Sequence, residues 1–273
     1  MRWLLVIFGF ALAGTPPVVE SSHGTLYFIA ASSTAIVVAA DSLVSYDNGA
    51  PPVTTDKLIS LGNRGVCFIG GYSSIEDKVY LEQTAKDWIR TNPKASLPEA
   101  HKSIDAKLSA SLKEFRSKHP EWDPREPRPD DPFSYFICVG YYRGLSQIDA
   151  TYYTAQPHDI TSAHESRSPM PAGPIVTEGW HSVCEEIFRA KATTPLLQFK
   201  SDPVVMKYRK ALAANKVSST STQDLLHLSQ ICLEATESAE GRAFDPNAEK
   251  VGPPNRYVVI EKDKPLKWVE HPD

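Results

Sequence analysis

The chain has 273 residues, of which 41% are hydrophobic and 23% charged, and its formal net charge is −4. This composition is close to the average for globular proteins, and beyond the N-terminus no apolar run approaches the roughly 20 residues that span a membrane. Because the net charge is negative and the 29 lysines and arginines are scattered along the chain, nucleic-acid binding is disfavoured. We expect a soluble mature body built as one large domain.

The first residues form a pattern of their own. Met1 and Arg2 give a short positive start, residues 3–10 are apolar, and residues 11–13 have the small-x-small pattern that signal peptidase accepts. We therefore expect residues 1–13 to be a signal peptide and the protein to be periplasmic or secreted. Two alternatives stay open: an uncleaved membrane anchor, or a start codon assigned upstream of the true start of a cytoplasmic protein.

Short β-rich segments begin the body of the protein. Residues 25–31 and 35–41 are predicted to be strands joined by a polar turn at residues 32–34, which is a hairpin signal. Residues 58–61 and 66–69 repeat this arrangement around a glycine-containing turn. The sequence therefore predicts four strands before the first helix.

Two helices are predicted next. Ser73 and Glu76 have the spacing of a capping box, and apolar residues recur behind them at helical intervals, so we expect a helix that begins at Ser73. Ser96 and Glu99 have the same spacing before a second amphipathic segment. Residues 123–132 are rich in proline and charge and are expected to form an exposed loop.

The second half again contains strands followed by helices. We expect strands at residues 134–142 and 147–154, helices at 179–190 and 222–238, final strands at 257–260 and 266–269, and no regular pattern at 156–175. This segregation favours an α+β fold with helices outside antiparallel sheets over alternating βαβ units.

Four cysteines, Cys67, Cys138, Cys184 and Cys232, have no C-x-x-C spacing, so they do not indicate a metal site. Most of them are predicted to be buried thiols. Export would permit a disulfide between Cys184 and Cys232, although sequence alone does not fix the connectivity. The eight histidines lack metal-binding spacings as well, and we expect neither a metal nor a cofactor.

Five residues near the start of the body carry the functional hypothesis. Gly24 precedes Thr25, and Asp41, Lys57 and Gly71 follow Thr25 by 16, 32 and 46 residues. In this ungapped register the chain resembles proteasome β subunits and their bacterial relatives, which are N-terminal-nucleophile hydrolases. Each residue alone has a structural explanation, such as a strand threonine or a surface lysine, but the shared register favours catalysis.

The resemblance implies a four-layer αββα sandwich, in which two antiparallel sheets lie between helical layers. It also implies that residues 14–24 are a short propeptide, that the chain cleaves itself between Gly24 and Thr25, and that residues 25–273 form the hydrolase domain. A homo-oligomer is expected on the same basis.

The chemistry explains why these residue types occur together. A threonine hydroxyl needs a base to take its proton. An N-terminal Thr25 supplies that base, because its free α-amine has a reference pKa of about 7.7 to 8.0. The charge of Lys57 would favour the alkoxide-like form of the hydroxyl, and Asp41 would hold Lys57 in place. The backbone N–H of Gly71 would stabilise the oxyanion.

The same resemblance assigns substrate contacts to Ser45, Ile69 and Ser73. The two serines would form hydrogen bonds with an extended peptide, and Ile69 would border the pocket for the side chain before the cut bond.

The second half of the chain matches the family less well. Glu237 stands where the family usually has an aspartate near the active threonine. Glu178 and Glu240 replace supporting serines, and the additional negative charges would raise the pKa of the catalytic amine.

We therefore expect threonine-dependent hydrolysis of peptide bonds, without nucleic acid and without a membrane in the mature form. The first alternative is a small-molecule amidase or acylase that uses the same threonine. The second is a catalytically silent β-like subunit with a role in assembly or binding, which the altered glutamate positions motivate.

Overall fold

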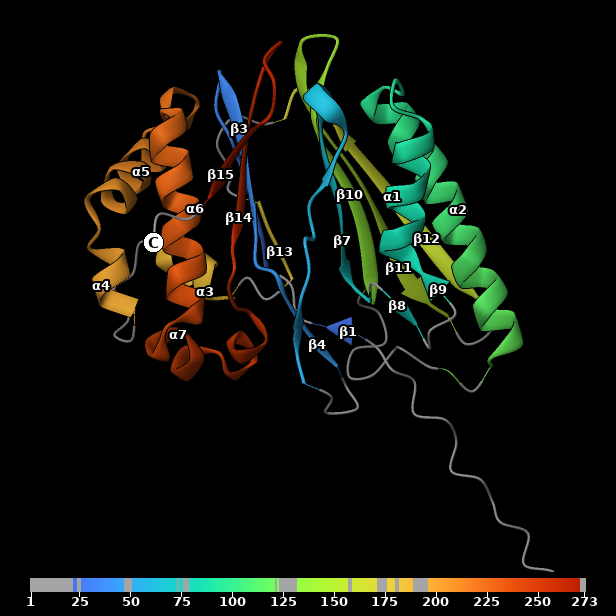
Figure 1. Ribbon diagram of the computed structural model, residues 1–273. Coiled ribbons are helices and arrows are strands. Elements are labelled where there is room, and N and C mark those ends of the chain that lie inside the picture. Colours follow the sequence, from blue (N-terminus) through green and yellow to red (C-terminus); the bar gives the residue numbers. More distant parts are fainter. Residues whose placement is uncertain are drawn as a thin grey trace, which may run out of the picture.

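The computed structural model shows an α+β protein with antiparallel sheets and helices. It describes residues 22–23, 26–46, 51–72, 74–75, 79–120, 122, 132–156, 159–170, 176–179, 182–188 and 196–270. In Figure 1, helices α3 to α7 lie on one side of the strands, and α1 and α2 lie on the other.

One five-stranded antiparallel sheet, which we call sheet I, contains the first strands of the body. Its order is β13 (Val176–Gly179), β2 (Leu26–Ala31), β3 (Ala35–Ala40), β14 (Arg256–Glu261) and β15 (Lys267–Glu270). The hairpin of β2 and β3 lies within this sheet, with β13 on one side and β14 and β15 on the other.

A second five-stranded antiparallel sheet, sheet II, has the order β12 (Ile160–Arg167), β11 (Leu145–Ala155), β10 (Ser134–Tyr142), β7 (Gly65–Gly71) and β6 (Ile59–Ser60). The structure also has two smaller sheets. The first has the order β1 (Ser22–His23), β4 (Leu43–Tyr46) and β5 (Val53–Thr54). The second consists of β8 (Ser74–Ile75) and β9 (Val79–Tyr80).

The α-helices are α1 (Leu81–Thr91), α2 (Leu97–Lys118), α3 (Ser182–Phe188), α4 (Leu197–Lys200), α5 (Pro203–Ala213), α6 (Thr222–Glu237) and α7 (Ala239–Phe244). Short 3-10 helices are η1 (Gly62–Arg64), η3 (Val217–Ser219) and η4 (Pro246–Lys250). Within the part of the chain described, no helix has the length and apolar character needed to cross a membrane.

Strand β2 explains how the cores are arranged. All six of its residues are buried. Alternate residues of a strand point to opposite faces, and here Leu26 and Phe28 pack with α3, α5 and α6, whereas Tyr27 and Ile29 pack against residues of sheet II. A third cluster lies between sheet II and helices α1 and α2. Both faces of sheet I are therefore covered, which accounts for the continuous apolar sequence of β2 and β3.

The capping box predicted at Ser73 is wrong. Residues Ser74 and Ile75 form strand β8, and helix α1 begins only at Leu81. A strand pair is inserted where the sequence spacing indicated a helix start. In contrast, Ser96 caps α2 with the predicted box, since its hydroxyl accepts from Glu99 N–H and the Glu99 carboxylate accepts from Ser96 N–H.

Several elements of the second half were not predicted. The segment 156–175 contains strand β12, whose residues are almost all polar and exposed, as suits the edge of a sheet. Gly179 ends strand β13 instead of starting a helix, and α3 begins at Ser182. Helices α4, α5 and α7 had no counterpart in the prediction. Most of the loop expected at residues 123–132 lies outside the described residues.

The prediction that most of the cysteines are buried thiols is wrong, because all four are buried but form two disulfides. Cys184 and Cys232 join α3 to α6, which is the bond considered possible from the sequence. Cys67 and Cys138 face each other in register on β7 and β10, with their Cα atoms 4.1 Å apart. Their pairing depends on strand register, which the cysteine spacing alone does not indicate.

Candidate active site

The candidate site lies where β2 begins and β3 ends. These strands are antiparallel, with Tyr27 opposite Ala40, so the next residue pair along the ladder is Leu26 and Asp41. The Asp41 N–H donates to the Leu26 carbonyl (3.3 Å), and the Leu26 N–H donates to Asp41 Oδ1 (2.7 Å). The first residue of β2 is thereby fixed to the carboxylate at the end of β3.

Lys57 lies on the other side of this carboxylate. Its Nζ is 3.0 Å from Asp41 Oδ1 and 3.0 Å from Oδ2, and it donates to the Leu43 carbonyl at 2.6 Å. Asp41 is 0% exposed and Lys57 is 4% exposed. The two residues, 16 positions apart in the sequence, therefore form a buried ion pair. Their contact agrees with the expectation from the sequence.

Burial dominates the electrostatics of this pair. Removal from water lowers the pKa of Lys57 below its ordinary value, and the opposite charge of Asp41 acts against that change. Burial likewise raises the pKa of Asp41, while the Lys57 charge and the Leu26 N–H act in the other direction. A lysine whose pKa is lowered by burial is chemically suited to proton transfer as well as to charge stabilisation.

Backbone groups near the carboxylate, which were not predicted from the sequence, also fix its surroundings. Leu43 N–H donates to Asp41 Oδ2 (3.1 Å), and Ser42 N–H donates to the carbonyl of Gly252 (3.2 Å). The Gly252 backbone amide also lowers the pKa of Asp41, but its effect is smaller than those of Lys57 and Leu26. Gly252 lies more than 200 residues away in the chain, and no local motif marks it.

Gly24 and Thr25 lie outside the described residues. Thr25 is nevertheless joined to the Leu26 nitrogen by a peptide bond of about 1.33 Å. Because that nitrogen is hydrogen-bonded to Asp41 Oδ1, the buried ion pair lies beside the peptide unit that links Thr25 to Leu26.

Gly71 ends strand β7 in a conformation that requires glycine. Its φ is +71°, and a Cβ at this position would lie 2.2 Å from the carbonyl oxygen of Phe133 on the neighbouring chain segment. The adjacent hydroxyl of Ser134 lies 3.1 Å from the Gly70 carbonyl oxygen and 2.9 Å from that of Tyr72, and its single proton can be donated to either. Close packing thus requires glycine here, independently of the oxyanion role, which stays a prediction.

Two of the three residues expected to contact substrate, Ile69 and Ser45, lie in the described part of the chain. Ile69 is 4% exposed and packs in the cluster beneath α1 and α2, and its carbonyl accepts from Tyr27 Oη at 2.7 Å. Ser45 lies in strand β4, where its backbone pairs with that of His23. Ser73 lies outside the described residues. Their roles as substrate contacts stay predictions.

Glu237, the last residue of α6, is held by a residue next to the site. Its Oε1 accepts from Asn255 Nδ2 at 2.8 Å. Asn255 immediately precedes β14, whose Arg256 lies opposite Ala40, so Asn255 is at the ladder position next to Asp41. The structure therefore brings Glu237 to the same end of sheet I as the ion pair. Asn255 was not identified from the sequence.

The other two altered glutamates lie on different elements. Glu240 is in the first turn of α7, and the backbone of Glu178 pairs with Tyr27 in sheet I.

Within the part of the chain that is described, no group of three or more His, Cys, Asp or Glu side chains is arranged to hold a metal ion.

Two residues that precede Thr25, Ser22 and His23, form a strand as well. Strand β1 pairs antiparallel with β4, with Ser22 opposite Tyr46 and His23 opposite Ser45. Residues 22 and 23 thus add a strand to β4, whose first residue, Leu43, contacts both Asp41 and Lys57.

Comparison with known proteins gives no further assignment. No protein-family model matches the chain, and no curated protein matches it.

Proposed function

We propose that the protein is an N-terminal-nucleophile hydrolase that cleaves itself between Gly24 and Thr25 and then hydrolyses amide bonds, with peptides as the leading substrate class. The observation that carries this proposal is the buried pair of Asp41 and Lys57, hydrogen-bonded to the Leu26 nitrogen. Through the Asp41 carboxylate, this contact connects a desolvated ammonium to the backbone nitrogen of Leu26, the residue that follows the proposed nucleophile.

In the proposed reaction, the free amine of Thr25 takes the proton of its own hydroxyl as the oxygen attacks the substrate carbonyl. The bond from carbonyl carbon to leaving nitrogen then breaks, and the amine returns the proton to that nitrogen. This leaves an ester on Thr25, which water hydrolyses by the same proton transfers in reverse order. Before maturation, the same hydroxyl attacks the Gly24 carbonyl, the bond from that carbonyl carbon to the Thr25 nitrogen breaks, and the hydroxyl proton passes to this nitrogen, so that the shift leaves an ester and a free amine. Water then hydrolyses the ester, which frees the Thr25 hydroxyl and releases the preceding segment with Gly24 as its terminal carboxylate.

The ion pair has a defined part in this scheme. The positive charge of Lys57 favours the developing negative charge on the Thr25 oxygen and disfavours protonation of the neighbouring amine. Asp41 keeps the ammonium oriented through both of its carboxylate oxygens. In such sites, loss of one donor to the oxyanion raises the barrier by about 3 to 4 kcal/mol, and the Gly71 N–H is the donor we propose.

A peptide substrate is supported by the pairing of β1 with β4. Residues 22 and 23 precede the proposed cleavage site and form an antiparallel ladder with residues 45 and 46. A chain segment on the acyl side of the cut bond is thus accommodated as an added strand, which is a common mode of peptide recognition. A small acyl amide would not use this ladder.

The finer architecture is part of the same proposal. Three hydrophobic clusters separate, in order, the helices α3 to α6, sheet I, sheet II, and helices α1 and α2. This order supports a four-layer αββα sandwich. The two disulfides support export, since such bonds persist in oxidising compartments. A homo-oligomer stays a prediction.

The mass of the purified protein tests the proposal directly. We expect a species that begins at Thr25, and we expect Thr25→Ala to remain uncut at this bond and inactive. Thr34→Ala, which alters a turn at the other end of β2, should be processed and active. A panel of fluorogenic peptides and simple acyl amides should show faster cleavage of the peptides. If Thr25→Ala is still cut before residue 25, another protease performs the cleavage and self-processing is refuted.

A further inference from the structure

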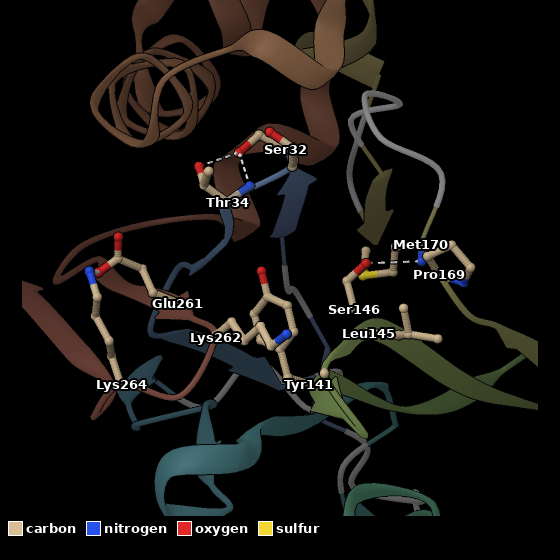
Figure 2. A pocket seen from close by; sticks show the side chains of 12 residues that line it. Ser32, Thr34, Tyr141, Leu145, Ser146, Pro169, Met170, Glu261, Lys262 and Lys264 are labelled. Atoms are coloured by element: carbon tan, nitrogen blue, oxygen red, sulfur yellow. Dashed lines mark hydrogen bonds and ion pairs between the residues drawn. The ribbon is translucent and has the colours of Figure 1, made fainter.

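A pocket opens at the end of strand β2 opposite the candidate active site. It has a volume of about 770 Å³ and lies among three hairpin turns. The turns are those between β2 and β3, between β10 and β11, and between β14 and β15, and the segment after β12 adds Pro169 and Met170. Both sheets therefore contribute to the pocket, which Figure 2 shows from close by.

The pocket is separate from the ion pair. Leu26, at the start of β2, contacts Asp41, whereas Ser32, just after the end of this strand, lines the pocket. A six-residue strand rises about 20 Å. A ligand in this pocket would therefore not touch the Asp41 and Lys57 side chains.

Among the described residues, one cation that lines the pocket has no ion-pair partner. Lys264 Nζ is 3.0 Å from Glu261 Oε2, so these two charges neutralise each other. No carboxylate of the described residues lies within ion-pair distance of Lys262, which also lines the pocket. The lining therefore presents a net single positive charge.

The ammonium of Lys262 lies against a glycine. A Cβ on Gly144 would be 2.9 Å from Lys262 Nζ and 3.0 Å from its Cε. Gly144 also has a φ of +77°, which the tight turn between β10 and β11 requires. The absence of a side chain at this turn therefore gives the lysine its position at the pocket wall.

Two hydroxyl groups add hydrogen-bond donors. Tyr141 rises from β10 to the centre of the pocket, between Lys262 and Ser146 (Figure 2). Burial and the nearby charge of Glu261 raise the pKa of Tyr141, so its hydroxyl stays protonated at neutral pH. Ser146 Oγ accepts from Met170 N–H at 3.1 Å, which leaves its own proton for a ligand.

The remaining lining is apolar. Leu145 is 50% exposed at the pocket and Met170 is 5% exposed in its wall. An exposed leucine beside a cation and two hydroxyl donors fits a ligand with an acidic end and a hydrocarbon body.

We propose that this pocket binds a small organic carboxylate, whose anionic group contacts Lys262, Tyr141 and Ser146 and whose apolar part covers Leu145 and Met170. A monoanion matches the single unpaired cation. A phosphate dianion would meet the Glu261 carboxylate with too little positive charge to balance both, and a cationic ligand would be repelled by Lys262.

The test uses the full chain with the Thr25→Ala substitution, so that self-processing and turnover do not affect the measurement. Binding of hexanoate is measured by titration calorimetry at pH 7.5, with 1-hexanol, hexylamine and inorganic phosphate as comparison probes. Lys262→Gln and Tyr141→Phe remove the charge and one donor. Lys216→Gln, at an exposed lysine of the turn after α5, is the matched control.

We expect saturable binding of hexanoate that Lys262→Gln weakens at least about tenfold, as loss of a charge-assisted hydrogen bond does. Tyr141→Phe should weaken it severalfold, whereas Lys216→Gln should leave it unchanged. Binding that does not depend on Lys262, equal binding of 1-hexanol or hexylamine, tighter binding of phosphate, or no saturable binding would each overturn the proposal. Because the tested protein carries Thr25→Ala, the outcome of the binding test is independent of the proposed hydrolase activity.

Discussion

Removal of the Asp41 carboxylate is the most informative perturbation of the candidate site. The Lys57 side chain is only 4% exposed. In Asp41→Asn its ammonium therefore stays buried but loses its counter-charge. At the observed separation of 3.0 Å, the attraction between the two charges is about 5 to 6 kcal/mol for an effective dielectric constant of about 20. Loss of one partner from such a buried pair destabilises a fold by about 3 to 5 kcal/mol.

A double-mutant cycle measures this coupling. Asp41→Asn, Lys57→Met and the double variant are compared by urea unfolding in the Thr25→Ala background, with both disulfides oxidised. We expect each single substitution to lower the free energy of unfolding by about 3 to 5 kcal/mol, and the double variant to lose at least about 1 kcal/mol less than the sum. Glu114→Gln, which breaks an exposed pair with Lys118, should leave stability unchanged. Additive losses, or a loss below about 1 kcal/mol for Asp41→Asn, would refute the buried-pair argument.

Three further predictions concern the glycine, the buried histidine and one disulfide. Gly71→Ala should destabilise the protein by several kcal/mol more than Gly62→Ala, because both positions have positive φ but only the Cβ at Gly71 would collide with backbone; equal losses in urea unfolding would contradict the steric account. Burial lowers the pKa of His101 below its ordinary value of 6.5. The unfolded state therefore binds the proton first, and stability should fall as the pH drops below 6.5 toward the lowered pKa, by at most about 1.4 kcal/mol per pH unit. In His101→Gln this part of the pH dependence should be missing; an unchanged profile would show that other groups cause it. Removal of the bond between Cys184 and Cys232, which closes a loop of 48 residues, should lower the free energy of unfolding by about 4 kcal/mol, and a double Cys→Ser variant as stable as the oxidised parent would contradict this.

The parts of the fold that could be predicted are those specified by local sequence. The α2 cap depends on Ser96 and Glu99, which are three residues apart, and its prediction was correct. The predicted strand at residues 134–142 agrees with β10, because continuous β-forming residues mark it. Strand β12 was missed because an exposed edge strand does not need alternating apolar residues. Its pairing with β11 is a non-local property.

The candidate site shows the same division. The contact between Asp41 and Lys57 was expected from their register with Thr25, and it is present. The supports from Gly252 and Asn255 were not foreseen, because the loop that carries them reaches the site only through the pairing of β14 with β3. The register with Thr25 identified Asp41 and Lys57, but it could not identify Gly252 and Asn255, which a segment far along the chain brings to the site.

The position of β1 links the proposed maturation to the proposed substrate. Strand β2 is held in sheet I by β3 and β13 and by the Asp41 carboxylate, so cleavage before Thr25 would leave its pairing intact. Residues 22 and 23 pair only with β4 in the part of the chain that is described. Their departure would expose the backbone N–H and C=O groups along one edge of β4, and an exposed edge is a template for another extended chain. The cut that frees the catalytic amine would therefore also open the strand edge along which a peptide substrate binds.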